Sequence, residues 1–187
     1  MALPQFRPAP GSWTYDDYCA LPDDGNRYEI LEGELVMVPA PGEPHQFASM
    51  ALSVALYVFI MANRLGRLYA APFDIKLAPR NVVQPDIIFI SNARMHLLTE
   101  ANVQGSPDLA VEILSRGTRR RDRTTKFRIY AEHGIAHFWI VDPVARTLEA
   151  YQLTDNTYTL TDRRAGDETF EPALFPGLSI PLATLWS

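Results

Sequence analysis

The sequence has little cysteine, little lysine and no apolar run long enough to cross a membrane. Its single cysteine, Cys19, allows no internal disulfide and no cysteine-based metal cluster. Such a chain is typical of a reducing compartment, so we expect a cytoplasmic protein. The N-terminal residues carry no basic stretch followed by an apolar core, and we therefore expect no signal peptide.

The longest apolar run, residues 47–62, is interrupted only by Ser49 and Ser53. It is shorter than the roughly 20 residues that a bilayer-spanning helix needs. A helix that is apolar on nearly all sides is more simply a buried core helix. The run therefore predicts a core helix and no membrane association.

The formal net charge of −5 argues against a protein that coats nucleic acid non-specifically. The charge is unevenly spread, because seven basic residues and only one acid, Asp122, lie between Arg116 and Arg128. Taken alone, this run is typical of a solvated helix face. It is also the one concentrated basic patch on an acidic chain.

The length of 187 residues and the hydrophobic fraction of 47% fit one globular domain. We expect residues 1–12 to form a flexible arm and residues 13–187 a single domain. The order of segments is helix, strands, helix, strands, which indicates an α/β or α+β fold with a mixed sheet. The segments we expect are a short helix capped by Thr14, strands in 27–40, a helix ending at Gly66, strands in 67–78 and 82–90, a strand in 108–115, a helix from Thr118 to His133, a strand in 136–143 and a hairpin in 147–164.

Two of the strand-like segments place an acid among aliphatic residues. By the two-residue period of a strand, Asp86 shares a face with Ile88, and Glu112 shares a face with Ala110 and Leu114. Burying an unpaired carboxylate among aliphatic residues costs free energy. A bound divalent cation, which prefers oxygen ligands, offsets that cost. Either acid alone is better explained by an ion pair or a backbone contact. Both together, followed by a basic helix, favour a metal site.

Lys126 is one of only two lysines in the chain, although arginine is plentiful. It lies 14 residues beyond Glu112 on the helix that follows the Glu112 strand. A compact ammonium can stabilise charge or orient water in a way that arginine does poorly. Without further context, an exposed helix lysine is an equally good reading.

The strings VVQPDIIFI, DLAVEILS, TRRRDRTTKFRIYAEHGI and FWIVDP follow one another in this order. Together with RYEILEGELV, the loop PAPGEPHQ and the closing FPGLSIPL, they resemble the Uma-two family of bacterial restriction-endonuclease-like proteins, in the PD-(D/E)XK nuclease superfamily. The resemblance covers roughly residues 12–187.

The resemblance implies a restriction-endonuclease-like mixed four-stranded sheet flanked by helices, here with added β-hairpins. It makes Asp86 the PD aspartate and Glu112 the acidic position. The usual pattern places a lysine two residues after that acid, where this chain has Leu114. The resemblance instead assigns the lysine to Lys126. Glu29 and His45 also lie in matching stretches; a structural role is the better reading for both, with an accessory role at the site as the alternative.

The resulting hypothesis is a metal-dependent deoxyribonuclease. Asp86, Glu112 and the Ile113 carbonyl would hold Mg²⁺ or Mn²⁺, and Lys126 would orient water or stabilise the transition state. The residues expected to hold DNA phosphates are Arg116, Arg119, Arg120 and Arg123. The alternative is a catalytically silent module of the same fold that binds nucleic acid or a protein. A hydrolase built on Ser115 has no supporting histidine and acid. Because double-strand cleavage usually needs two active sites, we expect a homodimer, with the hairpin 147–164 as its candidate interface.

Overall fold

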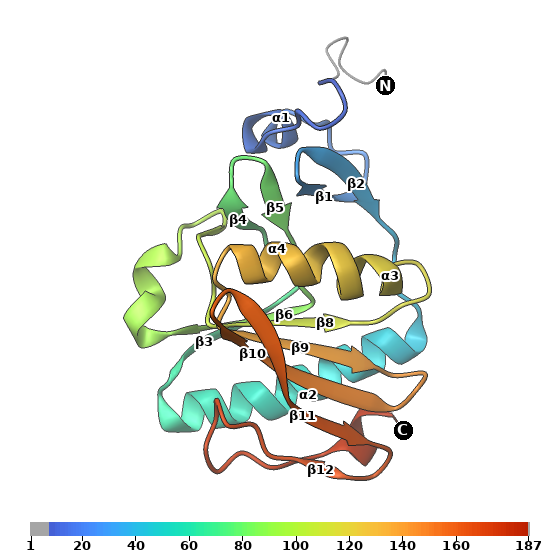
Figure 1. The fold of residues 1–187 in the computed structure, drawn as a ribbon, viewed down its shortest axis with the longest axis vertical. Helices are drawn as coiled ribbons and strands as arrows, with labels where there is room; N and C mark the ends of the chain where they lie inside the picture. The colour runs from blue at the N-terminus through green and yellow to red at the C-terminus, as the bar shows by residue number, and fades with distance from the viewer. Residues whose placement is uncertain (1–7, 187) are drawn as a thin grey trace.

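A six-stranded mixed sheet is the centre of the computed structural model, which describes residues 8–186 (Figure 1). The strand order is β11-β10-β9-β8-β6-β3; β8 and β9 are parallel and all other neighbours are antiparallel. The strands are β3 (Gly66–Ala70), β6 (Ile87–Ser91), β8 (Leu109–Ile113), β9 (His137–Asp142), β10 (Thr147–Thr154) and β11 (Thr157–Ala165).

A second, five-stranded sheet carries the N-terminal part of the chain, in the order β2-β1-β5-β4-β7. Its strands are β1 (Arg27–Leu31), β2 (Glu34–Val38), β4 (Ile75–Ala78), β5 (Asn81–Val83) and β7 (Val103–Gln104). The short helix α1 (Tyr15–Cys19) packs on this sheet, whereas the helical turn η1 (Asn92–Leu97) contacts β6 and β3 of the six-stranded sheet. As predicted, Thr14 caps α1, and its hydroxyl accepts a hydrogen bond from the Asp17 N–H.

The chain passes between the two sheets five times, and two of these passages divide runs that the sequence predicts as single strands. The run 82–90, predicted as one strand, is divided between β5 and β6, and the run 67–78 is divided between β3 and β4. Pro85 lies in the first interruption and has no N–H to donate to a strand ladder. Asp86 is consequently in the short link between the sheets rather than inside a strand.

Helix α2 (Glu43–Asn63) packs on one face of the six-stranded sheet. Its inner side is fully covered through Ala48, Leu52, Leu56 and Ile60. The prediction of a buried core helix is correct for this side only, because several large apolar side chains on the other side are exposed. From the sequence we expect no apolar run long enough to cross a membrane, but α2, with 21 residues, is the one helix within residues 8–186 that is long and apolar enough to do so by length and composition.

The opposite face of the sheet is covered by a helix with an irregular middle turn. It comprises α3 (Arg119–Arg121), the π-helical turn η2 (Asp122–Lys126) and α4 (Phe127–Glu132). Gly134 ends it with φ +76°, as predicted. The predicted Thr118 cap is wrong, because the Thr118 hydroxyl contacts Ser115 and makes no capping bond to the helix.

The C-terminal segment completes the core on the α2 side. It contains β12 (Thr169–Phe170), β13 (Ile180–Pro181) and η3 (Leu182–Leu185), and it buries Phe170 and Phe175 against Trp139. The predicted hairpin is β10–β11, which turns at Asp155 and Asn156 with φ +50° and +59°. The expected α+β fold, a mixed sheet flanked by helices with added hairpins, is confirmed.

Part of the predicted N-terminal arm, residues 1–7, lies outside the described residues. The remainder is held by hydrogen bonds within itself and to the second sheet. The Ser12 N–H donates to the Ala9 carbonyl at 3.0 Å, and Arg80, in the turn between β4 and β5, donates to the Gly11 carbonyl at 2.5 Å. Trp13, just after the arm, is buried in a small cluster with Ile30 and Val82.

Candidate active site

Lys126 lies at the centre of a buried group of carboxylates. Its Nζ is 2.8 Å from Glu29 Oε1, 3.0 Å from Glu112 Oε1 and 3.7 Å from Asp122 Oδ1. None of the four residues is more than 4% exposed. The alternative that Lys126 is an exposed helix lysine therefore does not hold.

Three separate elements bring these groups together. Glu112 is on β8 with its side chain toward α4, on the same face as Ala110 and Leu114, as the two-residue period predicts. Glu29 comes from β1 of the other sheet. Asp122 and Lys126 are the first and last residues of the π turn η2. Such turns within α-helices are often found at functional sites.

Asp86 is beside this group, where β8 ends. Its Oδ2 accepts a hydrogen bond from the Ile113 N–H at 2.7 Å and lies 3.2 Å from His45 Nε2. Because the N–H and C=O of a strand residue point to the same side, the Ile113 carbonyl faces the Asp86 edge as well. The link after Pro85 therefore places the Asp86 carboxylate directly beside the residue that follows Glu112.

Sequence reasoning missed two members of the group, Asp122 and Tyr130. The Tyr130 hydroxyl donates to Glu112 Oε1 at 2.5 Å, so that this oxygen accepts from both Tyr130 and Lys126. The signal that could have found them is their spacing, since Asp122, Lys126 and Tyr130 follow one another at intervals of four along the helix. Arg123, three residues before Lys126 on the same helix, contacts Glu149 and not this group.

The electrostatics of the group follow from its burial. Burial raises the pKa of Glu112 well above its usual value; Lys126 opposes this, while Asp122, Asp86 and Glu29 add to it. Burial also raises the pKa of Asp122. For Lys126, burial acts to lower the pKa, but the carboxylates of Glu112, Glu29 and Asp122 more than offset it and hold the pKa well above the usual range. Lys126 is therefore a permanent cation at ordinary pH and not a proton acceptor.

Several carboxylate oxygens in this region lack a hydrogen-bond partner among the described residues. Buried examples are Glu29 Oε2 and both oxygens of Asp122. Asp86 and Glu112 each use one oxygen for all their hydrogen bonds, Oδ2 and Oε1 respectively. The other oxygen of each acid, Asp86 Oδ1 and Glu112 Oε2, has no hydrogen bond within residues 8–186.

These two oxygens fit a hard divalent cation, which takes one or two carboxylates and completes its shell with water and phosphate. The Ile113 carbonyl can add a third oxygen. No three acidic, histidine or cysteine side chains within residues 8–186 converge as a ready-made metal cage. The donor set therefore suits an ion shared with a phosphate substrate rather than a closed structural site.

The basic run is mostly neutralised within the molecule. Arg119 donates to both Asp142 oxygens, at 2.5 and 2.9 Å, and Arg123 donates to Glu149 at 2.7 Å. Arg116 and Arg120 are exposed and form no ion pair with any described residue. Of the four arginines expected to contact phosphate, these two are the ones available to do so.

An Asp122→Asn variant is expected to be more stable than the parent protein by about 1–2 kcal/mol near neutral pH, since it removes a buried charge whose burial outweighs its long, 3.7 Å ion pair with Lys126. Burial raises the folded-state pKa of Asp122 above its unfolded value, so its ionisation opposes folding as pH rises. The advantage should consequently disappear as pH falls below the usual aspartate pKa. Thermal unfolding of both proteins across pH measures this.

The exposed Asp167 supplies the matched control, Asp167→Asn, which should change stability little at any pH. A loss of stability in Asp122→Asn at neutral pH would contradict this prediction. It would mean that the ion pair of Asp122 with Lys126 stabilises the fold by more than the burial of the Asp122 charge destabilises it.

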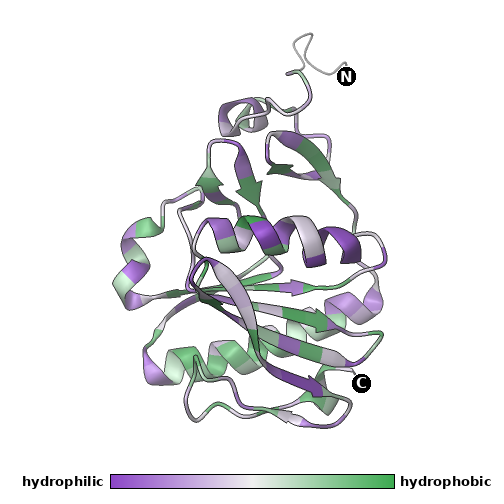
Figure 2. Ribbon diagram, in the orientation of Figure 1, coloured by the Kyte–Doolittle hydropathy of each residue, from purple (hydrophilic) through white to green (hydrophobic). Residues whose placement is uncertain are grey.

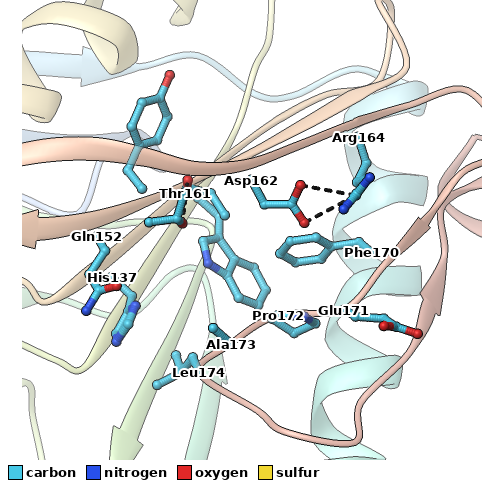
Figure 3. A pocket seen from close by; sticks show the side chains of 13 residues that line it. His137, Gln152, Thr161, Asp162, Arg164, Phe170, Glu171, Pro172, Ala173 and Leu174 are labelled. Atoms are coloured by element: carbon cyan, nitrogen blue, oxygen red, sulfur yellow. Dashed lines mark hydrogen bonds and ion pairs between the residues drawn. The ribbon is translucent and has the colours of Figure 1, made fainter.

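A separate hollow of about 220 Å³ is shown in Figure 3, and none of the carboxylates around Lys126 lines it. Trp139 and Phe170 form its floor on the α2 side of the six-stranded sheet, the face opposite Glu112. The ion pair of Asp162 with Arg164, at 3.1 Å, lies at its edge. His137 also lines it, and burial lowers the pKa of that imidazole. The hollow contains none of the residues expected at the active site.

Comparison with known proteins agrees with this architecture. A solved structure described as a "putative nuclease belonging to DUF820", from Anabaena variabilis ATCC 29413, has a TM-score of 0.75 and 20% sequence identity, covering 92% of this chain and 97% of the other. At this identity the likeness concerns the fold. A search of curated proteins gives no match. The model of the Uma2 family, described as "Putative restriction endonuclease", matches residues 15–183. The chain therefore belongs to the Uma2 family and has its nuclease-like fold.

Proposed function

We propose that this protein is a metal-dependent endonuclease that hydrolyses phosphodiester bonds in DNA. The observation that carries the proposal is the juxtaposition of Asp86, in the link before β6, and Glu112, on β8, with the buried ammonium of Lys126. Each of the two acids keeps one oxygen free of hydrogen bonds to described residues. That is the composition needed to bind a cation and a phosphate together.

In this proposal Asp86, Glu112 and the Ile113 carbonyl hold Mg²⁺ or Mn²⁺. The bound ion would lower the pKa of a coordinated water and offset charge on the scissile phosphate. Lys126, charged at all ordinary pH, donates hydrogen bonds to the phosphate oxygens on which negative charge develops. Glu29 and Tyr130 act as positioning residues, because Glu29 holds Lys126 and Tyr130 holds Glu112. Arg116 and Arg120 contact the DNA backbone without reading its sequence.

The second candidate is a catalytically silent module of the same fold that binds nucleic acid or a protein. One observation favours it: the Lys126 ammonium is already bound to Glu29 and Glu112 at 2.8 and 3.0 Å. A cation at that position satisfies the acids without any metal. The two candidate functions differ in one observable: the nuclease cleaves DNA when Mg²⁺ or Mn²⁺ is added, and the silent module binds without cleaving it.

The test is cleavage of supercoiled plasmid and of labelled oligonucleotides with Mg²⁺ or Mn²⁺, compared with EDTA. We expect metal-dependent nicking by the parent protein and at least a ~100-fold slower rate in Glu112→Gln, which preserves the shape of the side chain and removes its charge. DNA binding by the same variant should persist or strengthen, because a negative charge is lost. Binding without cleavage in any metal, unchanged in Glu112→Gln, would support the silent module.

A further inference from the structure

The outer side of α2 carries an uninterrupted line of exposed apolar side chains. Six of them are between 40% and 68% exposed: Phe47, Met50, Val54, Tyr57, Val58 and Met61. We call this set the α2 stripe. It lies opposite the inner side that packs on the sheet, and hydrophobic residues run along most of the helix in Figure 2. A lone exposed leucine or valine needs no explanation, but a contiguous stripe indicates an interaction surface.

The spacing of the α2 stripe is that of a helix-packing seam. Phe47, Met50, Val54, Tyr57 and Met61 follow one another at intervals of three, four, three and four residues. This alternation keeps one line of side chains facing a partner helix over four turns. A partner of this kind presents an apolar helix of similar length.

Apart from Tyr57, whose mirror position is Ala51, the stripe is also symmetric about Val54. Phe47 and Met61 are each seven residues from Val54, and Met50 and Val58 are each four residues from it. If two α2 helices cross antiparallel with Val54 at the two-fold axis, Phe47 of one faces Met61 of the other and Met50 faces Val58. Every apolar residue then meets an apolar residue, which is the self-complementarity that a two-fold interface requires.

The charge of the molecule favours the same partner. The chain carries a net charge of −5, yet residues 44–63 of α2 contain no aspartate, glutamate, lysine or arginine. Two copies can therefore approach through α2 without repulsion between like charges. A helix that lies on a membrane surface usually carries basic residues on its polar face, and α2 has none. Its inner residues Leu52, Leu56 and Ile60 are, moreover, completely buried in the core and do not face a lipid surface.

The exposed area is sufficient for a specific contact. Free side chains of these types expose on the order of 200 Å² each, so at the observed exposures the stripe leaves roughly 600 Å² uncovered per copy. Two copies would bury about 1,200 Å², at the lower limit for stable protein interfaces. The hairpin β10–β11, the interface expected from the sequence, offers one exposed large apolar side chain, Leu160.

We propose that the protein forms a two-fold dimer through antiparallel α2 helices that cross at Val54. The proposal does not depend on the nuclease activity. The first test is light scattering after size-exclusion chromatography over a concentration series reaching about 100 µM, since self-association depends on protomer concentration. We expect a dimer for the parent protein and for Leu160→Glu, and a monomer for Val54→Glu.

Circular dichroism checks that the variants are folded, which is expected because both side chains are exposed in the monomer. A monomeric parent protein over the whole range would overturn the proposal. A dimer that survives Val54→Glu but not Leu160→Glu would assign the interface to the hairpin. A monomer that binds phosphatidylglycerol vesicles through the α2 stripe would assign the stripe to a membrane surface.

Cysteine crosslinking tests the antiparallel arrangement in a Cys19→Ser background. Val54→Cys should form a disulfide-linked dimer on mild oxidation, because the two copies of residue 54 meet at the axis. Met61→Cys alone should not, whereas a mixture of Met61→Cys and Phe47→Cys should crosslink. Crosslinking of Met61→Cys with itself and not with Phe47→Cys would contradict the antiparallel crossing.

Discussion

A Lys126→Met variant is expected to lose about 3–5 kcal/mol of folding stability at neutral pH. Methionine fills a similar volume, so the loss does not come from a cavity. It comes from Glu29 and Glu112, which are buried and would lose the ammonium that each of them contacts. Chemical denaturation of the two proteins measures the difference. Lys76, the only other lysine, provides the control variant Lys76→Met, which should lose little beyond its cation–π contact with Tyr15.

The pH dependence distinguishes this cause from a simple packing defect. Burial raises the folded-state pKa of Glu112 and Asp122, and Lys126 opposes the rise in both cases. Removing Lys126 raises the two pKa values further. A group with a raised folded pKa contributes stability at low pH and loses it as pH increases. The stability gap between parent and variant should therefore narrow as pH falls. A gap that stays constant with pH would mean that the loss is one of packing.

Divalent ions give a second readout of the same variant. A cation that binds the folded state and not the unfolded state raises stability in proportion to the logarithm of its concentration. With the ammonium gone, Mg²⁺ or Mn²⁺ is expected to raise the midpoint of unfolding more in Lys126→Met than in the parent protein. Equal shifts in both proteins would indicate that the ion does not bind near Lys126.

Asp86→Asn is expected to slow metal-dependent cleavage by about 100- to 1,000-fold while leaving the fold intact. The asparagine side-chain oxygen can still accept the Ile113 N–H bond that Asp86 accepts at 2.7 Å. What the variant loses is the negative charge beside Glu112. Single-turnover cleavage rates and calorimetric titration with Mg²⁺ should both show the defect.

Asp162→Asn is the matched control for this measurement, because Asp162 pairs with Arg164 on the far face of the sheet. It should cleave at the parent rate. Full activity in Asp86→Asn would mean that Asp86 only accepts the Ile113 N–H bond and does not bind the metal. The metal would then have to be held by other residues.

The sequence predicts the components of the site better than their partners. The two-residue period places Glu112 on the face that meets α4, and the resemblance to the Uma-two family selects Lys126 from the next helix. Both depend on local patterns. By contrast, the contact of Lys126 with Glu29 joins the π turn η2 to strand β1, 97 positions earlier in the chain, and no local pattern specifies it.

The basic run shows the same limit. In the sequence, Arg119 and Arg123 lie in a patch that faces no obvious acid. In the structure their partners, Asp142 and Glu149, come from β9 and β10 of the sheet that this helix covers. The division of the run 82–90 between two sheets was equally hidden, since Pro85 predicts an irregularity but not a change of sheet. Each of these features depends on ion pairs or strand pairing between residues far apart in the sequence.

The π turn η2 fixes how the two ends of its helix are rotated relative to each other. An α-helix advances by about 100° per residue, so one residue more or less in the turn reorients everything on one side of it by that angle. Deleting Thr124 or Thr125 would leave the helix continuous but out of phase. The shortened helix could then keep either the ion pair of Arg119 with Asp142 or the contact of Lys126 with Glu112, but not both. The extra residue in this turn thus allows one continuous helix to place Arg119 against Asp142 of the sheet and Lys126 among the carboxylates of the site.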